Sequence, residues 1–213
     1  PSKWTYEKGA SGYGNQELQN YTDRVENASY TTHKGLGCLK ITALNDNYDG
    51  VAYSSARIKT EGLFEQRYGR FEARLKLPYG PGLWPAFWML GANYATDVWP
   101  KCGEIDIMEQ LNHDGIVYQT IHSHYKNDLG FTKPVPTKTV PYNKGQFNIF
   151  GIEWTPEALT FKVNGATTLV YPNLHLADES VKKQWPFDTS FYLILNYALG
   201  GPGTWPGTIT DSE

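Results

Sequence analysis

The sequence has little of several features that mark common protein classes. Among its 213 residues are only two cysteines, Cys38 and Cys102, which is too few for a disulfide framework. We expect two buried free thiols, with a single disulfide as the alternative. No apolar stretch approaches the roughly 20 residues that a membrane-spanning helix needs. Charged residues make up 19% and the net charge is −3, so no basic stripe exists to neutralise phosphates. We therefore expect the chain to bind neither membranes nor nucleic acid.

Helical patterning is also scarce. Only residues 177–184 read as a short helix, which Pro186 would end. The chain shows no repeat, no low-complexity tract and no linker, and its length suits one domain with a substantial core. We therefore treat residues 1–213 as a single domain.

Aromatic residues and turn formers are abundant, with 15 Tyr, 9 Phe, 7 Trp, 21 Gly and 13 Pro. Apolar and polar residues alternate from Tyr68 to Leu77, which predicts a strand with one face on a core. Residues 160–163 and 166–171 flank Asn164-Gly165, a strong signal for a type I′ hairpin. Further strands are expected at 39–43, 117–124, 146–154 and 191–199. Many short strands joined by turns predict an all-β sandwich of two antiparallel sheets.

Three carboxylates lie close together in an apolar segment, G-E-I-D-I-M-E. Glu104 and Asp106 are two residues apart and share a strand face, whereas Glu109 is five from Glu104 and would lie on the opposite face. One extra residue near Ile107-Met108, a β-bulge, would return Glu109 to the side of the other two. The spacing therefore predicts a bulge at this point.

With such a bulge the Cα atoms of the two glutamates lie roughly 13 Å apart, from four strand steps. Their side chains could then approach the about 5–5.5 Å that retaining glycosidases use. In that mechanism Glu104 is the nucleophile and Glu109 the general acid and base, kept protonated by nearby like charge, while Asp106 orients a catalytic glutamate. The alternatives are a solvated acidic face or a cation site.

The motif and its surroundings resemble glycoside hydrolase family 16, in particular laminarinase-type β-1,3-glucanases and β-1,3-1,4-glucanases. The matching segments are S-K-W-T-Y (2–6), G-N-Q-E-L-Q-N-Y-T (14–22), S-S-A-R-I (54–58), Y-G-R-F-E-A-R (68–74), G-L-W-P-A-F-W-M-L-G (82–91), W-P-K-C (99–102), I-E-W-T-P (152–156), W-P-F-D (185–188) and L-N-Y-A-L-G-G (195–201). The resemblance implies a jelly-roll β-sandwich of two curved sheets with an open cleft, and cleavage within a glucan chain with retention. With Met108 present, the segment matches the bulged form of the family motif. Bacillus-type lichenases carry the unbulged form, in which the last Glu comes two residues after the Asp.

A glucan cleft needs aromatic platforms for sugar faces and polar groups for hydroxyls. By resemblance, the tryptophans at 84, 88 and 99 lie near the cleaved bond, and His122 lies close to the catalytic acid. Arg57 resembles a substrate-contacting arginine on the non-reducing side. The candidate substrate-binding residues are Trp84, Trp88, Trp99, Arg57, His122, Asn20, Asn196 and Trp205.

Most of these side chains have a structural alternative. It is core packing for Trp84, Trp88 and Trp99. It is ordinary loop or strand-end structure for Arg57, Asn20, Asn196 and Trp205. Glu17 is expected to be structural. Tyr118, Thr120, His122 and His124 are expected on one strand face, and without a third ligand at suitable spacing the two histidines predict no metal site.

The resemblance also sets expectations about partners. Catalysis should need no cofactor, although a structural Ca²⁺ is common in the family. The partner should be a β-glucan polysaccharide, and the protein a secreted monomer. No signal peptide is visible at Pro1, so we expect a mature or trimmed sequence, and we expect the terminal segments usual in the family to be missing. A galactan hydrolase, a transglycosylase or a non-catalytic glucan-binding protein are the alternatives.

Overall fold

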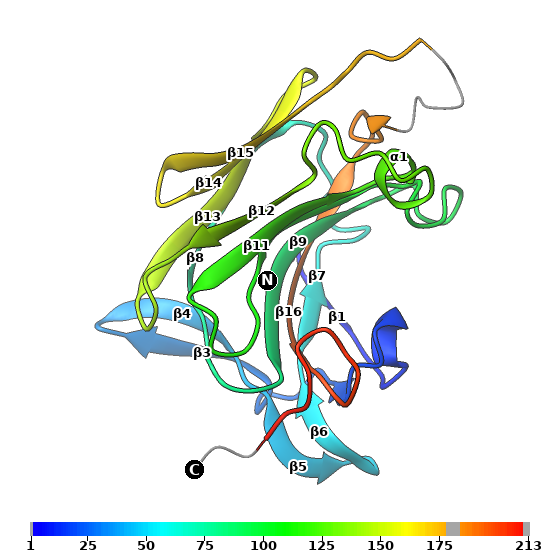
Figure 1. The fold of residues 1–213 in the computed structure, drawn as a ribbon. Helices are drawn as coiled ribbons and strands as arrows, with labels where there is room; N and C mark the ends of the chain where they lie inside the picture. The colour runs from blue at the N-terminus through cyan, green and yellow to red at the C-terminus, as the bar shows by residue number, and fades with distance from the viewer. Residues whose placement is uncertain (1, 178–183, 211–213) are drawn as a thin grey trace.

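The computed structural model describes residues 2–177 and 184–210, and β-strands dominate this part of the chain (Figure 1). The strands are β1 (Thr5–Glu7), β2 (Gln19–Tyr21), β3 (Ala28–His33), β4 (Leu36–Ile41), β5 (Leu44–Tyr48), β6 (Val51–Ser55), β7 (Arg57–Lys59), β8 (Gly69–Lys76), β9 (Leu83–Gly91), β10 (Glu104–Glu109), β11 (Ile116–His122), β12 (Thr137–Pro141), β13 (Phe147–Trp154), β14 (Ala158–Val163), β15 (Ala166–Pro172) and β16 (Phe191–Leu199). A 3₁₀ turn, η1 (Gly12–Gly14), and a one-turn helix, α1 (His124–Asn127), accompany them.

No helix in the described ranges is long and apolar enough to cross a membrane. The short helix predicted for residues 177–184 falls mostly on 178–183, which lie outside the described residues.

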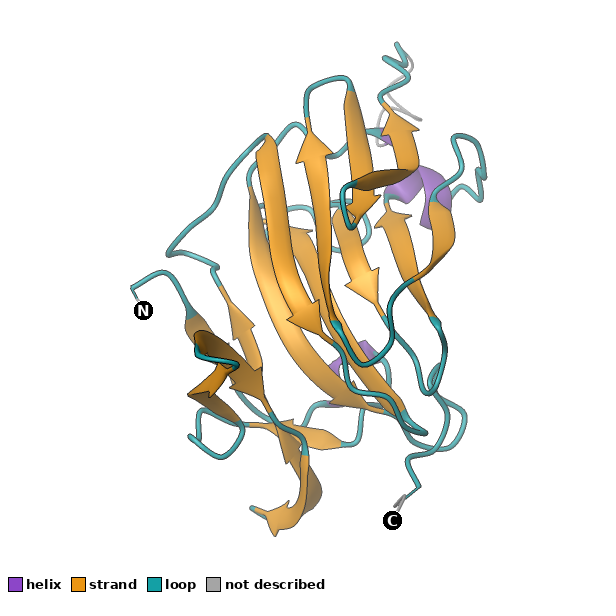
Figure 2. Ribbon diagram, turned by 90° about the vertical axis from the view of Figure 1, so that its left-hand side faces the viewer, coloured by secondary structure: helices purple, strands orange, loops and turns teal. Residues whose placement is uncertain are grey.

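Two large antiparallel sheets form the body of the fold. One has the strand order β1-β7-β16-β9-β10-β11-β12 and the other β15-β14-β13-β8. Figure 2 shows the long strands curving together. The predicted two-sheet sandwich is confirmed for these layers. The sequence did not predict the two smaller sheets, β2-β6-β5 and β3-β4, nor that β2 pairs with β6 in parallel.

Apolar side chains from both large sheets meet in one core. Phe87 and Ile105 come from the seven-stranded sheet, Phe150 and Phe161 from the four-stranded one, and all four are almost fully buried. Burying a side chain of this kind stabilises a fold by about 1.5–3 kcal/mol, so this layer holds the sheets together.

Because side chains alternate across a strand, the seven-stranded sheet carries a different set of residues on the face away from this core. On β9, Phe87 enters the core while Trp84 and Trp88 are only partly buried. On β10, Ile105 enters the core between Glu104 and Asp106. We call this second side of the seven-stranded sheet the outer face, and it carries the predicted site.

Two sequence predictions about local structure need correction. Strand β11 ends at His122, and Ser123 caps α1 by accepting a hydrogen bond from the Lys126 amide, so His124 is helical and does not share the strand face. Both cysteines are free, but Cys38 is only partly buried, because it lies on β4 among exposed residues such as Leu36 and Leu39, whereas Cys102 is completely buried.

The hairpin between β14 and β15 is confirmed. Val163 pairs with Ala166, leaving a two-residue turn in which Asn164 and Gly165 have φ values of 50° and 83°. Positive φ at both positions is the type I′ geometry that matches the twist of the flanking strands.

We expect Gly165→Ala to destabilise the protein by about 1–2 kcal/mol, the cost of a left-handed backbone with a Cβ atom. An added Cβ would meet nothing within 4 Å, so backbone strain alone should account for the loss. Urea unfolding measures it. Gly37→Ala is the matched control, since Gly37 also has open space but no positive φ, and should cost little. Equal losses for the two variants would contradict the assignment.

Candidate active site

Strand β10 contains the predicted β-bulge. The partners of Glu104, Asp106 and Glu109 on β9 are evenly spaced, two residues apart: Leu90, Trp88 and Ala86. Between Asp106 and Met108, β10 holds one residue more than β9 does. The extra residue brings Glu109 to the outer face together with the other two carboxylates, as the spacing predicted.

The three carboxyl groups differ in exposure. Asp106 and Glu109 are 3% and 8% exposed, whereas the Glu104 side chain keeps 18% of its surface open to solvent. Their ladder partners span four residues of β9, so the Cα atoms of Glu104 and Glu109 lie roughly 13 Å apart, with Asp106 midway. Glutamate side chains leaning toward each other from both ends can therefore flank one bond of a substrate.

A tryptophan side chain holds each outer carboxyl. Trp99 Nε1 donates to Glu104 Oε2 at 3.1 Å, and Trp84 Nε1 donates to Glu109 Oε1 at 3.0 Å. An indole N–H can only donate, so each bond fixes an acceptor oxygen and leaves the other oxygen of that carboxyl for chemistry.

His122 approaches the other side of the cluster. Its Nε2 lies 3.2 Å from Asp106 Oδ2 and 3.7 Å from Glu104 Oε1. Its Nδ1 lies 3.0 Å from Asn127 Nδ2 and 3.3 Å from Lys126 Nζ. Both of these groups are donors, so Nδ1 accepts and Nε2 carries the proton that faces the carboxylates. Burial lowers the pKa of His122 against the pull of Glu104, which favours the neutral ring.

The same tautomer bears on metal binding. Within the described ranges, Glu104, Asp106 and His122 are the one group with ligand atoms close enough for a metal ion, all within 4.8 Å of one another. A metal at His122 Nε2 would need the ring proton on Nδ1, where Asn127 and Lys126 both donate. The arrangement thus fits a proton donor to the carboxylates. The structural Ca²⁺ stays a prediction, and this group with its imidazole nitrogen does not suit an ion that takes oxygen ligands.

Burial raises the pKa of all three carboxyls. That of Glu104 rises to about 8, with the Asp106 charge adding to burial, and that of Asp106 to about 7. The pKa of Glu109 rises well above its usual value, through burial and then the charges of Asp106 and Glu104. A side-chain hydrogen bond between Glu104 and Asp106 requires a proton on one of them. The charges of Asp106 and Glu104 both raise the pKa of Glu109, so ionisation of this pair favours a protonated Glu109, which suits the acid.

Two predicted sugar contacts, Trp88 and Asn196, are bonded to each other. Trp88 Nε1 donates to Asn196 Oδ1 at 2.8 Å, and Asn196 Nδ2 donates to Tyr21 Oη at 3.1 Å. Asn196 is 7% exposed, and the oxygen and the nitrogen of its amide are both hydrogen-bonded within the protein. It therefore holds the Trp88 indole and has little capacity left to bind a sugar hydroxyl. The Arg57 guanidinium lies 4.9 Å from the centre of a Trp88 ring, and its Nε is 2.6 Å from Glu7 Oε2.

Trp205 lies at the Glu109 end of the cluster. Its ring meets Trp84 edge to face at 5.3 Å and Tyr118 at 4.9 Å, and the side chain is 50% exposed. It therefore offers an open aromatic surface beside the acid. Asn20 is buried and alternates on β2 with Tyr21, which faces the cluster, so the structure does not bring Asn20 into the site.

The groups that orient the predicted residues were not expected from the sequence. Lys126 and Asn127 fix His122, Tyr21 holds Asn196, and Glu7 pairs with Arg57. For Lys126 and Asn127, the one local signal in the sequence was Ser123, a residue type that commonly caps the start of a helix. The contacts of Tyr21 and Glu7 depend on long-range pairing and left no local pattern.

Comparison with known proteins extends these observations. The family model described as glycosyl hydrolases family 16 matches residues 3–210. A beta-glucanase from Rhodothermus marinus is 43% identical over 212 residues, which cover 97% of this chain and 72% of that protein. A keratan-sulfate endo-1,4-beta-galactosidase from Sphingobacterium multivorum is 39% identical over 166 residues, which cover 78% and 38%. The X-ray structure of the laminarinase from Rhodothermus marinus matches with a TM-score of 0.85 and 39% identity, covering 99% of this chain and 84% of that one. This similarity confirms the predicted jelly-roll sandwich.

Paired single-residue deletions test the bulge. Removing Met108 gives a regular strand with an even spacing between Glu104 and Glu109, so all three carboxylates should stay on the outer face and hydrolysis should remain measurable. Stability should fall by about 2–5 kcal/mol, since Met108 is 1% exposed. Removing Ile105, which is equally buried, should separate Glu104 from Asp106 and abolish hydrolysis. Comparable activity in the two folded variants would count against the bulge.

Asp106→Asn tests the electrostatic coupling. The Asp106 charge raises the pKa of both Glu104 and Glu109, so removing it should lower both. In a plot of kcat/KM against pH, the acid limb reports Glu104 losing its proton and the alkaline limb reports Glu109 losing its own. Both limbs should move to lower pH, on the order of one unit. Asp114→Asn is the control and should move neither. Limbs that stay in place or move apart would refute the coupling.

Proposed function

Because the chain belongs to glycosyl hydrolase family 16 and is a glycoside hydrolase, we propose that it is a retaining endo-β-glucanase acting on β-1,3-glucans or mixed β-1,3-1,4-glucans. The observation that carries this proposal is the bulged strand β10. It brings Glu104 and Glu109 to one open face on either side of Asp106, each with an indole N–H on one oxygen.

The roles of the two glutamates follow from their surroundings. Glu104 attacks the anomeric carbon while Glu109 gives its proton to the departing glycosidic oxygen, which leaves a glycosyl ester on Glu104. Water then displaces Glu104, and Glu109 takes the proton of that water. Glu104 suits the nucleophile because its side chain is the more exposed, and because His122 and the Trp99 N–H partly offset the rise in its pKa that burial and the Asp106 charge cause. The strongly raised pKa of Glu109 suits the acid.

Asp106 and His122 support this exchange of charge. Asp106 shares a proton with Glu104, so the pair can hold a single negative charge before the attack and release it afterwards. The His122 Nε2–H faces the same oxygens and stabilises that charge without carrying a full positive charge itself.

Aromatic surfaces along the outer face support a polysaccharide substrate. Trp99 is 43% exposed beside Glu104, and Trp205 is 50% exposed near Glu109. Arg57, on β7, lies three strands from β10, roughly 14 Å away at the usual strand spacing. A site that extends this far and is open suits an internal stretch of chain, which supports endo action. For a protein that acts on such a polymer, we also propose that it is secreted and that it is a monomer.

A galactan hydrolase is the second candidate, because one relative is named a keratan-sulfate endo-1,4-beta-galactosidase. The relative with higher identity over more of the chain is named a beta-glucanase, which favours glucan. A non-catalytic glucan-binding role is disfavoured, because the complete set of carboxylates with its donors is of no use for binding alone.

Digestion of laminarin, lichenan, barley β-glucan and agarose, with linkage analysis of the products, tests the substrate class. We expect internal cleavage of one or more of the glucans, with the β-anomer appearing first by proton NMR. Cleavage of agarose alone would overturn the glucan assignment, and an α-anomer would overturn retention. Glu104→Gln should reduce the rate by more than roughly a thousandfold. Glu72→Gln, an exposed glutamate on β8, should not.

A further inference from the structure

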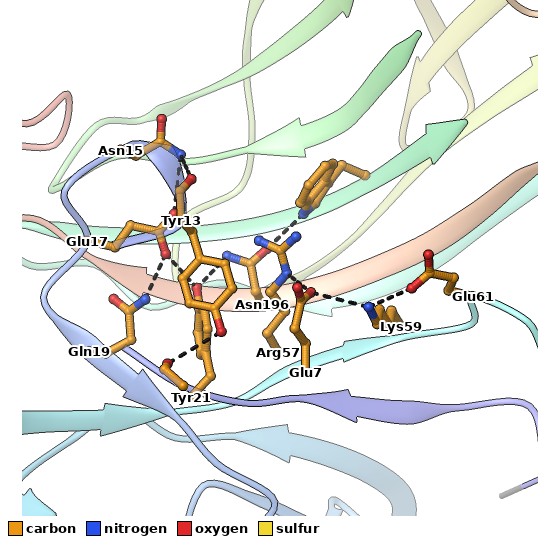
Figure 3. Close-up of polar contacts among 12 residues, drawn as sticks. Glu7, Tyr13, Asn15, Glu17, Gln19, Tyr21, Arg57, Lys59, Glu61 and Asn196 are labelled. Carbon is orange, nitrogen blue, oxygen red and sulfur yellow. Dashed lines mark hydrogen bonds and ion pairs between the residues drawn. The ribbon is translucent and has the colours of Figure 1, made fainter. Parts of the chain in front are cut away.

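A chain of hydrogen bonds runs from the outer face to a half-buried glutamate near the N-terminus of the chain. Trp88 donates to Asn196, Asn196 donates to Tyr21, and Tyr21 Oη donates to Glu17 Oε2 at 3.0 Å. Figure 3 shows the part of this chain from Asn196 through Tyr21 to Glu17. Each donor points the same way, so the carboxylate is the acceptor on which the preceding bonds depend.

Glu17 is itself held from two sides. Gln19 Nε2 donates to its Oε2 at 2.7 Å, and Asn15 Nδ2 donates to its Oε1 at 3.3 Å. The other end of the Gln19 amide accepts from the Leu199 backbone N–H at 2.7 Å, which ties this corner to β16. Gln19 and Tyr21 are 0% and 1% exposed, so water cannot substitute for a lost partner at these positions.

The far end of the chain lies beside the catalytic carboxylates. Trp88 is paired with Asp106 across β9 and β10, on the same face. The Arg57 guanidinium lies 4.9 Å from the centre of its ring and 5.0 Å from the centre of the Tyr13 ring. Tyr13 in turn meets Tyr21 edge to face at 4.9 Å. Tyr21 therefore touches both the chain of hydrogen bonds and this group of side chains.

We propose that Glu17 is a positioning residue that sets the orientation of the Trp88 indole for sugar binding, acting through Tyr21 and Asn196. The part about sugar binding rests on the proposed glucanase function. The chemical reason is donor and acceptor matching. Without the carboxylate, the buried Tyr21 hydroxyl finds its nearest acceptor in Asn196 Oδ1, which requires the amide to turn over. The turned amide presents its NH₂ to the Trp88 N–H, so two donors face each other and the indole moves.

The first test uses no substrate. Of the indole N–H signals in an NMR spectrum of the ¹⁵N-labelled protein, that of Trp88 is the one lost in Trp88→Phe. In Glu17→Ala this signal should shift, and its proton should exchange faster with solvent. In Glu17→Gln the side-chain oxygen can still accept a hydrogen bond from the Tyr21 hydroxyl, so the signal should stay close to its wild-type position. Trp154, whose indole donates to the Phe187 carbonyl oxygen in the core, is an internal reference and should not change. An unchanged Trp88 signal in Glu17→Ala would overturn the proposal.

The second test is a double-mutant cycle on glucan hydrolysis. Glu17→Ala should raise KM about fivefold, the factor for one net hydrogen bond, with little change in kcat. In a Trp88→Phe background, which keeps an aromatic ring but lacks the N–H donor, the same change should have little further effect. An equal rise in both backgrounds would show that Glu17 does not act through Trp88.

Two controls separate the possible failures. Glu61→Ala removes a carboxylate that pairs with Lys59 in the same region but is outside the chain of hydrogen bonds, and should change neither KM nor the indole signal. Tyr21→Phe removes the hydroxyl that would turn the Asn196 amide, so it should leave the Trp88 signal near its wild-type position, and Glu17→Ala added to it should cause no further shift. If no glucan is hydrolysed, the proposed function fails, while the indole measurement still decides whether Glu17 orients Trp88.

Discussion

A regular β-strand cannot present residues 104, 106 and 109 on one face, because its side chains alternate with a period of two. The extra residue in β10 removes this conflict, and the rest of the site depends on it. It returns Glu109 to the outer face while Ile107 and Met108 remain buried in the core. Strand β10 supplies apolar side chains to the core and carboxylates to the outer face. A shift of its register would move one of these two groups of side chains to the wrong face, so the register is strongly constrained.

Gathering three carboxyls creates an electrostatic difficulty that the neighbouring groups resolve. Burial and mutual repulsion raise all three pKa values, so the cluster keeps protons that isolated side chains would lose. The indoles of Trp99 and Trp84 and the neutral His122 supply donors, and none of them adds a full charge. The site therefore holds a nucleophile and an acid of the same residue type, and their surroundings decide which is which.

The sequence predicted those features that depend on local spacing. Strand alternation at 68–77, the Asn164-Gly165 turn and the bulge were all readable, because each follows from a period or from the backbone freedom of one residue. The end of β11 was misjudged by two residues, since the cap that stops it is a single serine. The ring tautomer of His122 depends on α1, for which the Ser123 cap was the only local signal. The support of Trp88 could not be read, because Asn196 on β16 and Tyr21 on β2 are far apart in the sequence and only folding brings them together. Resemblance supplied Arg57 and the tryptophans, but not what holds them.

The central claim is that Glu104 becomes covalently bonded to the sugar while Glu109 moves the proton. Its most direct test is mass spectrometry of peptides after brief reaction with a 2-deoxy-2-fluoro-β-glucosyl-type oligosaccharide that has a good leaving group, since the fluorine slows release of the ester. The account predicts one added fluoro-oligosaccharide group on the peptide that contains β10, located by fragmentation to Glu104. A label on Glu109, or turnover of an ordinary glucan with an α-configured first product, would contradict it.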